Sequence, residues 1–106
     1  MKFKIDELPP STNQLKYYNS LKQNWIKRNL IKTNKKFSKP ISLKMKIYTS
    51  NIRRDIDNFL KAIFDLLEKS SVIRNDNLIY KLEVEKIKSQ NECIELEIRP
   101  YPLFTK

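Results

Sequence analysis

The first half of the chain contains a short alternating stretch and a longer helical repeat. Phe3 and Ile5 alternate with lysines, which predicts a strand, and the prolines of LPPSTN (8–13) end it because proline cannot donate to a sheet ladder. A 3.6-residue apolar period then predicts a basic amphipathic helix over about 14–33. Its expected buried positions are Leu15, Tyr18, Leu21, Trp25, Ile26 and Leu30, with Lys16, Lys22, Lys27 and Arg28 on the wetter side.

The second half repeats this scheme and closes with two strands. Ile41 to Ile47 alternates apolar and polar residues, which predicts a strand, and SNIRRDID (50–57) breaks the alternation. A helix is predicted at about 58–69, with Phe59, Ala62, Ile63, Leu66 and Leu67 inside. Alternation at 78–84 and 94–98 predicts a closing antiparallel pair. The order β-α-β-α-β-β predicts a single α+β domain over residues 1–106, with two helices packed on one mixed sheet.

Length and composition limit the cellular setting. A chain of 106 residues suits one domain. No apolar run approaches the ~20 residues that a membrane span needs, and MKFKIDELPP lacks the apolar stretch of a signal peptide. We therefore expect a cytoplasmic protein without a membrane partner.

Absent residue types narrow the chemistry. With no histidine and one cysteine, Cys93, the chain has no Cys/His zinc site, internal disulfide or histidine-activated nucleophile. Catalysis would have to use carboxylates, lysine, hydroxyls or a bound metal. Because glycine is absent, we expect left-handed backbone positions to fall to Asn or Asp, or to be avoided.

Charge is distributed unevenly along the chain. Residues 1–54 hold 14 Lys/Arg and two acids, whereas residues 55–106 hold 8 Lys/Arg and 10 acids. A cationic half points to a polyanionic partner, with nucleic acid the leading candidate. A lysine-rich genome is the alternative explanation, although it accounts less well for the uneven split.

Aspartates gather where a strand, a loop and a helix meet. Asp55 and Asp57 are two residues apart, so in an extended segment both carboxylates would face one point. Asp76, in a later loop, is expected to complete the set. Carboxylate oxygens in such an arrangement suit a hard cation such as Mg²⁺.

Each of these residues also has a simpler interpretation. Asp57, just before a helix, is typical of an N-cap, and Asp76 within Asn-Asp-Asn is typical of a turn. Lys61 lies four residues from both Asp57 and Asp65, so helix-face pairing explains it. Arg53 and Arg54 would then be solvated.

Taken together, the residues match a family. RRDIDNFLKAIFDLLEKSSVIRNDN (53–77) resembles the signature of RusA-type Holliday junction resolvases: Arg-Asp-x-Asp-Asn, a lysine four residues after the second Asp, and a third Asp one helix later. Asp65 matches a further acidic position, and PPSTN (9–13) resembles the family's Pro-Pro-Ser-x-Asn segment. The chain departs from the family at Ser70-Ser71, where members usually have glycine.

The resemblance implies a Mg²⁺-dependent endonuclease, with Mn²⁺ able to stand in, that nicks four-way or branched DNA during recombination and repair in a bacterial or phage-infected cell. It also implies a homodimer. It assigns Asp55, Asp57 and Asp76 to the metal and Lys61 to charge on the reacting phosphate. The candidate DNA-binding residues are Asn13, Lys16, Arg53, Arg54 and Asn58.

Two other function classes remain open from the residues. A non-catalytic, phage-regulator type of DNA-binding module would use the basic helix at 14–33. A structural interaction protein would use the aspartates as helix caps. The binding module does not explain why carboxylates gather in a protein meant to hold phosphates, since carboxylates repel DNA unless a cation bridges them.

Overall fold

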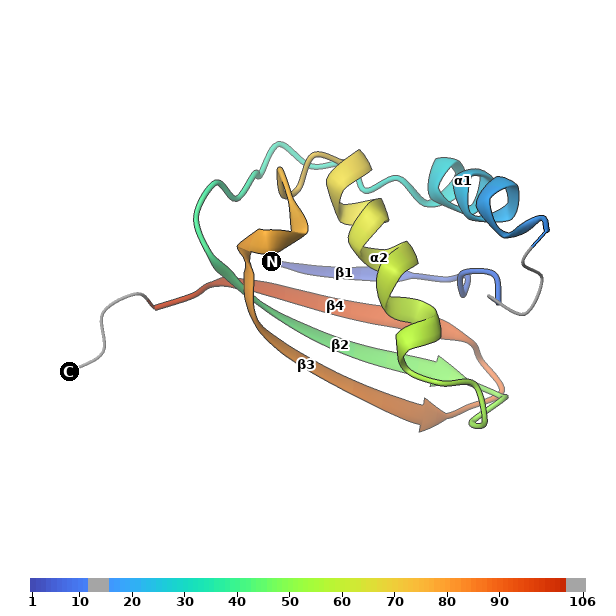
Figure 1. Ribbon diagram of the computed structural model, residues 1–106. Helices are drawn as coiled ribbons and strands as arrows, with labels where there is room; N and C mark the ends of the chain where they lie inside the picture. Colours follow the sequence, from blue (N-terminus) through green and yellow to red (C-terminus); the bar gives the residue numbers. More distant parts are fainter. Residues whose placement is uncertain (12–15, 103–106) are drawn as a thin grey trace.

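The computed structural model describes residues 1–11 and 16–102 and has two layers, a four-stranded sheet and two helices on one of its faces (Figure 1). The elements are β1 (Lys2–Ile5), α1 (Tyr18–Asn29), β2 (Ile41–Thr49), α2 (Asp57–Lys69), the 3₁₀ turn η1 (Asp76–Leu78), β3 (Ile79–Lys88) and β4 (Cys93–Pro100). The predicted α+β class and element order are confirmed.

The strand order is β1-β4-β2-β3, so β3 is an edge strand. β2 and β3 are parallel, with α2 as the crossover between them, and β4 lies antiparallel between β1 and β2. The predicted pairing of 78–84 with 94–98 is therefore wrong, because β3 and β4 flank opposite edges of β2. An alternating pattern predicts a strand but not which strand it pairs with. Here α2 connects β2 to β3 as a helical crossover, and such a crossover allows two parallel strands to lie side by side.

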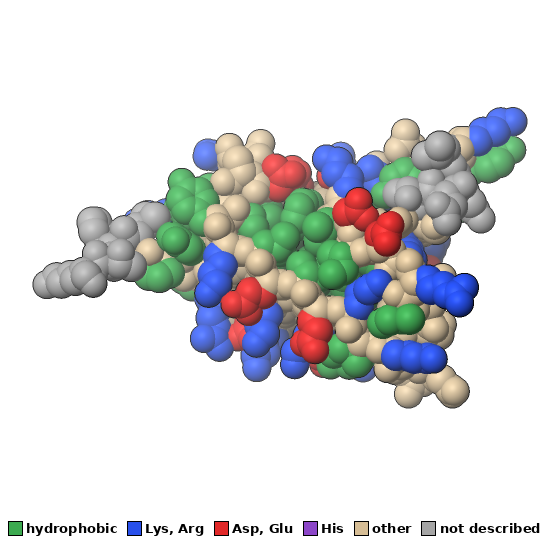
Figure 2. All heavy atoms as spheres, turned by 60° about the horizontal axis from the view of Figure 1, so that its bottom comes forward, with side chains coloured by type: hydrophobic (Ala, Val, Ile, Leu, Met, Phe, Trp, Pro, Cys, Tyr) green, Lys and Arg blue, Asp and Glu red, His purple; other side chains and the backbone are tan. Residues whose placement is uncertain are grey.

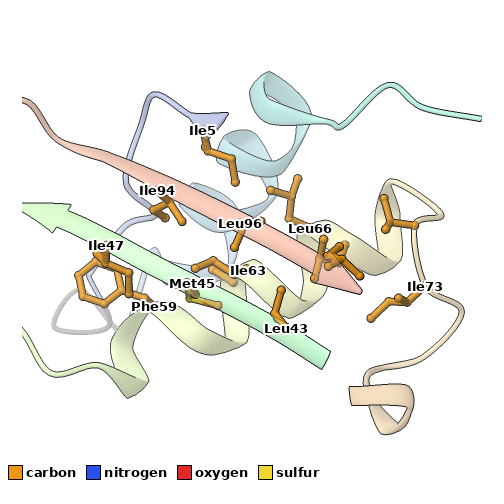
Figure 3. Packing of buried hydrophobic residues seen from close by; sticks show 14 of the residues in the cluster. Ile5, Leu43, Met45, Ile47, Phe59, Ile63, Leu66, Ile73, Ile94 and Leu96 are labelled. Carbon is orange, nitrogen blue, oxygen red and sulfur yellow. The ribbon is translucent and has the colours of Figure 1, made fainter. Parts of the chain in front are cut away.

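The core lies between the centre of the sheet and α2 (Figure 3). Ile41, Leu43, Met45 and Ile47 of β2 are buried, as their alternation predicted. The five expected α2 side chains, Phe59, Ala62, Ile63, Leu66 and Leu67, are all fully buried against them. Burial of this continuous apolar surface is the main stabilising term of the fold.

Helix α1 differs from its prediction. It covers Tyr18–Asn29 rather than 14–33, and Leu15 lies outside the described residues. Trp25 and Ile26 are buried as expected, whereas Leu30 is exposed. Lys22, expected on the wetter side, is buried because its ammonium donates a 2.8 Å hydrogen bond to Asp65 of α2. A tertiary ion pair has moved this lysine to the helix interface.

Helix α2 ends without glycine. Ser70 is the C-cap, and Ser71 adopts a positive φ of 60°. The N–H of Ser71 donates to Glu68 and that of Val72 to Leu67, the two bonds of a Schellman motif. The expectation that Asn or Asp would take any left-handed position is therefore wrong, since the register of the helix end decides which residue is used.

Within the described ranges 1–11 and 16–102, none of the helices combines the length and the apolar character needed to cross a lipid bilayer.

Candidate functional site

The segment between β2 and α2 turns sharply instead of extending. Residues 52–54 form a turn and bend, and the N–H of Asn58 donates to the carbonyl of Asp55. Asp57 becomes the first residue of α2, and Ile56 occupies the N-cap position. The extended geometry expected for Asp55 and Asp57 is therefore wrong, and so is the N-cap interpretation of Asp57. Both carboxylates lie on exposed residues.

Arg54 ties this segment to the proline-rich one. Its Nη2 donates hydrogen bonds of 2.7 Å to the carbonyl oxygens of both Pro9 and Pro10. Its guanidinium carbon lies 4.1 Å from the ring centroid of Phe59, in cation–π range. Burial lowers the pKa of Arg54 from its ordinary value, with Glu92 and Tyr18 acting in the opposite direction. Arg54 is thus a half-buried anchor and not the solvated side chain of the simpler interpretation.

Lys86 fixes the segment from the β3 side. Its ammonium donates to the carbonyl oxygens of Ile52 at 2.5 Å and Arg54 at 2.7 Å. No motif or period in the sequence marks this lysine. A signal for it exists only once register is known, because Lys86 pairs with the buried Ile47 and so projects toward the helical side of the sheet.

Glu92 fixes the same segment from the start of β4. Its Oε2 accepts 2.9 Å hydrogen bonds from the backbone N–H and from the hydroxyl of Ser50, and a 3.3 Å bond from Thr49. These bonds, the backbone one first, lower the pKa of the Glu92 carboxyl against the opposing effect of burial. No pattern in the sequence predicts this contact.

These contacts surround a cleft of about 700 Å³. It is lined by Asp6, Glu7, Leu8, Pro9, Pro10, Ser11, Thr49, Asn51, Arg53, Arg54, Asp55, Asn58 and Glu92. Four of these residues are acids and two are arginines. The cleft therefore joins the Pro-Pro-Ser segment to the Arg-Arg-Asp segment, which are far apart in sequence.

Glu7 links the cleft to α1. Its carboxylate accepts hydrogen bonds from Arg28, the shorter at 2.6 Å, and from Asn29, while its carbonyl accepts from Trp25. The hydrogen bond from Arg28 is the main reason that the pKa of Glu7 lies below its ordinary value. The Glu7 carboxylate therefore holds α1 in place. Among the four acids of the cleft, Asp55 and Asp6 have carboxylates with fewer hydrogen bonds than those of Glu7 and Glu92.

Asp76 lies at the opposite end of α2. It opens η1, where the side chain of Asn75 accepts from the N–H of Asn77, so the turn interpretation of Asp76 is confirmed. Burial, with Asp76 and then Asp65 nearby, raises the pKa of Glu68 in the last turn of α2. Because 13 helical residues span about 20 Å, Asp76 is far from Asp55 and Asp57.

The expected convergence of Asp55, Asp57 and Asp76 does not occur within one chain. Among the described residues, no three carboxylate or cysteine side chains are placed to share a metal ion. The physical reason is the parallel β2–α2–β3 crossover, which returns the chain to the far end of the sheet before η1 begins (Figure 1).

The remaining candidates have simple surroundings. Lys61 is exposed near the start of α2, and its ammonium lies 3.6 Å from Asp65, so the pairing interpretation is confirmed for Asp65. Asn58 and Arg53 line the cleft. Lys16 is exposed, with its ammonium 5.6 Å from the centroid of the Tyr17 ring. Asn13 lies outside the described residues.

Comparison with known proteins shows which family the chain belongs to. The family model for the endodeoxyribonuclease RusA matches residues 9–99, which include both segments of the cleft as well as Asp76. The chain belongs to the RusA family. The RusA relative from Aquifex aeolicus (strain VF5), a crossover junction endodeoxyribonuclease, is 48% identical over 50 residues. That match covers 46% of this RusA-family chain and 40% of the Aquifex protein, less than half of either.

Proposed function

We propose that this RusA-family protein is a metal-dependent endonuclease that nicks four-way or branched DNA in recombination and repair. The observation that supports the proposal best is the anchoring of Arg54 to Pro9 and Pro10, which joins two segments of the family signature in one cleft. Membership of an endodeoxyribonuclease family supports the same activity.

The residues of the cleft and of the adjoining start of α2 have complementary roles in this proposal. Asp55 and Asp57 are metal ligands, and Arg53 faces the phosphate backbone from the rim. Lys61 stabilises negative charge on the reacting phosphate, because a compact ammonium near that phosphate acts electrostatically. Asn58, which lines the cleft together with Asp55, orients that ligand through its side-chain amide.

Mg²⁺, or Mn²⁺ in its place, is the proposed metal. The acids are hard oxygen ligands of the kind that Mg²⁺ prefers, but one protomer does not supply three of them together among its described residues. A bound divalent cation would make an attacking water more acidic and offset charge on the phosphate. We place its third protein ligand, Asp76, on a second copy of the chain.

A two-fold homodimer suits this division. If two α2 helices lie antiparallel, the Asp76 end of one faces the Asp55 and Asp57 end of the other, and two equivalent sites result. The flank of α2 along the edge strand β3 is suited to such a contact, because Tyr80 and Leu82 are 59% and 38% exposed there. Figure 2 shows hydrophobic side chains gathered near the middle of one face, with charged side chains around them.

A labelled four-way junction and a linear duplex of the same sequence test the activity. We expect nicking of the junction with Mg²⁺, no nicking with EDTA, and little nicking of the linear duplex. Junction binding without cleavage under both conditions would contradict the endonuclease and favour the non-catalytic binding module. Neither binding nor cleavage would favour the structural interaction protein.

A further inference from the structure

The fold neutralises part of the positive charge of the N-terminal half. Lys22 pairs with Asp65 and Arg28 with Glu7. Arg54 points at carbonyl oxygens. The cations that remain available to a partner are therefore fewer than the sequence suggests, and their location is set by the tertiary structure.

On the face of the sheet that the helices leave open, four more lysines have acidic neighbours. Lys2, Glu97, Lys44 and Glu83 lie opposite one another across the four strands, and Lys4, Glu95, Lys46 and Glu85 form the next row. Each lysine in these rows has a glutamate as its cross-strand neighbour, the arrangement in which opposite charges attract. With four lysines and four glutamates, the two rows carry no net charge and are a poor surface for a polyanion.

A different group of cations lies on the two segments next to the C-terminal end of α2. The connector cluster consists of Lys32, Lys35, Lys36 and Lys39, between α1 and β2, and Arg74, before η1. All five side chains are exposed, and within the described part of the chain none forms an ion pair with an acid.

The connector is held in place along the end of α2. The N–H of Ile31 donates to the hydroxyl of Ser70 at 2.9 Å, and the N–H of Phe37 donates to the carbonyl of Val72 at 2.8 Å. Phe37 also forms an isolated parallel bridge with Ile73. The connector cations are therefore presented from a backbone that is tied to the core at two points.

Lys36 and Arg74 face a shared groove. It has a volume of about 400 Å³ and is lined by Lys36, Phe37, Ser38, Glu68, Ser71, Ile73 and Arg74. Glu68 is its one acid among these lining residues. Arg74 is two residues from Asp76, so the cluster lies beside the acid that the α2 crossover placed far from the cleft.

We propose that the connector cluster binds the phosphodiester backbone of a duplex DNA arm next to Asp76. This rests on the proposed function and deepens it by naming the surface. Four of its five cations are lysines, which act as point charges toward phosphates rather than as readers of base edges. Phe37 is half-buried in the core packing and lies under Lys35, so it offers no exposed platform for an unpaired base. Duplex backbone is therefore the ligand that fits.

Two matched triple variants test the proposal. K35Q/K36Q/K39Q removes three charges from the cluster, and K2Q/K44Q/K46Q removes three from the open face. Each is titrated with a four-way junction and with a linear duplex in EDTA, at several salt concentrations. We expect the cluster variant to bind both DNAs 10- to 100-fold more weakly and to lower the slope of log K against log[salt] by about 2 to 3. The open-face variant should stay within about two-fold of wild type.

The outcomes separate the inference from the activity. Equal weakening by both variants, or wild-type binding by the cluster variant, would overturn the inference even if wild-type protein cleaves junctions with Mg²⁺. If wild-type protein binds without cleaving, the endonuclease fails while the contrast between the variants still decides the inference. The cluster variant should melt at the wild-type temperature, because its three lysines are exposed. The open-face variant should melt somewhat lower, because it loses the attraction of three lysines to their cross-strand glutamates. No DNA binding by wild-type protein would overturn both proposals.

Discussion

The guanidinium of Arg54 donates a 2.7 Å hydrogen bond to the carbonyl oxygen of Pro9, 45 residues earlier in the chain. This contact brings two short sequence segments together in the lining of one cleft. It also explains why the arginine directly before Asp55 is half-buried. Its guanidinium holds two segments of the protein together and is not free to bind a ligand.

Replacing Arg54 with Met should therefore destabilise the protein. Loss of hydrogen bonds from a charged donor predicts a decrease of about 2 kcal/mol in the free energy of unfolding, measured by urea denaturation. Nicking of a four-way junction should fall as well, because the Pro9–Pro10 wall is released. Arg53→Met, at an exposed position on the same loop, is the control for stability. Equal stability of the two variants would show that Arg54 is not an anchor.

The divided acid set can be tested by complementation. Asp55→Asn and Asp76→Asn should each abolish cleavage while junction binding persists, because a metal ligand is lost but the basic surface remains. Asp57→Asn should do the same. If Asp76 acts on the partner copy, mixing the Asp55→Asn and Asp76→Asn chains restores one intact site per heterodimer, and the mixture nicks the junction. A mixture that stays inactive after subunit exchange would contradict a site shared between two copies.

Lys61 separates a catalytic role from helix-face pairing. The 3.6 Å pair with Asp65 is exposed on the lysine side and contributes about 0.2–0.5 kcal/mol, so Lys61→Ala should change stability little. The single-turnover cleavage rate of the Lys61→Ala variant should fall on the order of 100-fold. Lys61→Arg should recover only part of the wild-type rate, because a planar guanidinium replaces a point charge. Lys81→Ala, which removes a lysine paired with Glu83, is the control. Wild-type cleavage by Lys61→Ala would leave only the pairing role.

The glycine-free end of α2 predicts a stabilising substitution. Ser71 has a φ of 60°, a region that costs a residue with a Cβ about 1 kcal/mol and costs glycine almost nothing. Ser71→Gly should therefore raise the free energy of unfolding by about 1 kcal/mol, which is about 4–8 °C in Tm for a domain of this size. Ser70→Gly should lower it, because Ser70 is right-handed and its hydroxyl accepts from Ile31. A lower Tm for Ser71→Gly would contradict the Schellman assignment.

Glu92 gives the stability a pH dependence of known sign. Its pKa is lowered in the folded state, mainly by the bond from the Ser50 N–H, so its contribution is present above the ordinary value of 4.5 and is lost as pH falls through the lower folded value. The difference in unfolding free energy between wild type and Glu92→Gln should therefore be largest near pH 7 and should close below about pH 4.5. Urea denaturation at pH 7, 5, 4 and 3 measures it. A difference that does not change with pH would show that the Glu92 carboxylate does not stabilise the loop.

Local patterns determined most of the elements of this fold. The alternation from Ile41 to Ile47 and the stripe from Phe59 to Leu67 predicted β2, α2 and their buried faces, because side-chain direction follows the periods of 2 and 3.6 residues. The family motifs in the sequence also marked the Pro-Pro-Ser and Arg-Arg-Asp segments as parts of one functional site, and both segments line the cleft.

The tertiary structure decided how these parts meet. A pattern of alternation carries no information on the neighbouring strand, so the place of β4 between β1 and β2 could not be read from it. The burial of Lys22 depended on Asp65, 43 residues away, and the contacts of Lys86 and Glu92 depended on register. From the sequence alone, three aspartates were predicted to share one site. The parallel crossover through α2 separates Asp76 from Asp55 and Asp57. The reason is that the 13-residue helix must return the chain along the full length of β2 before β3 can pair with it.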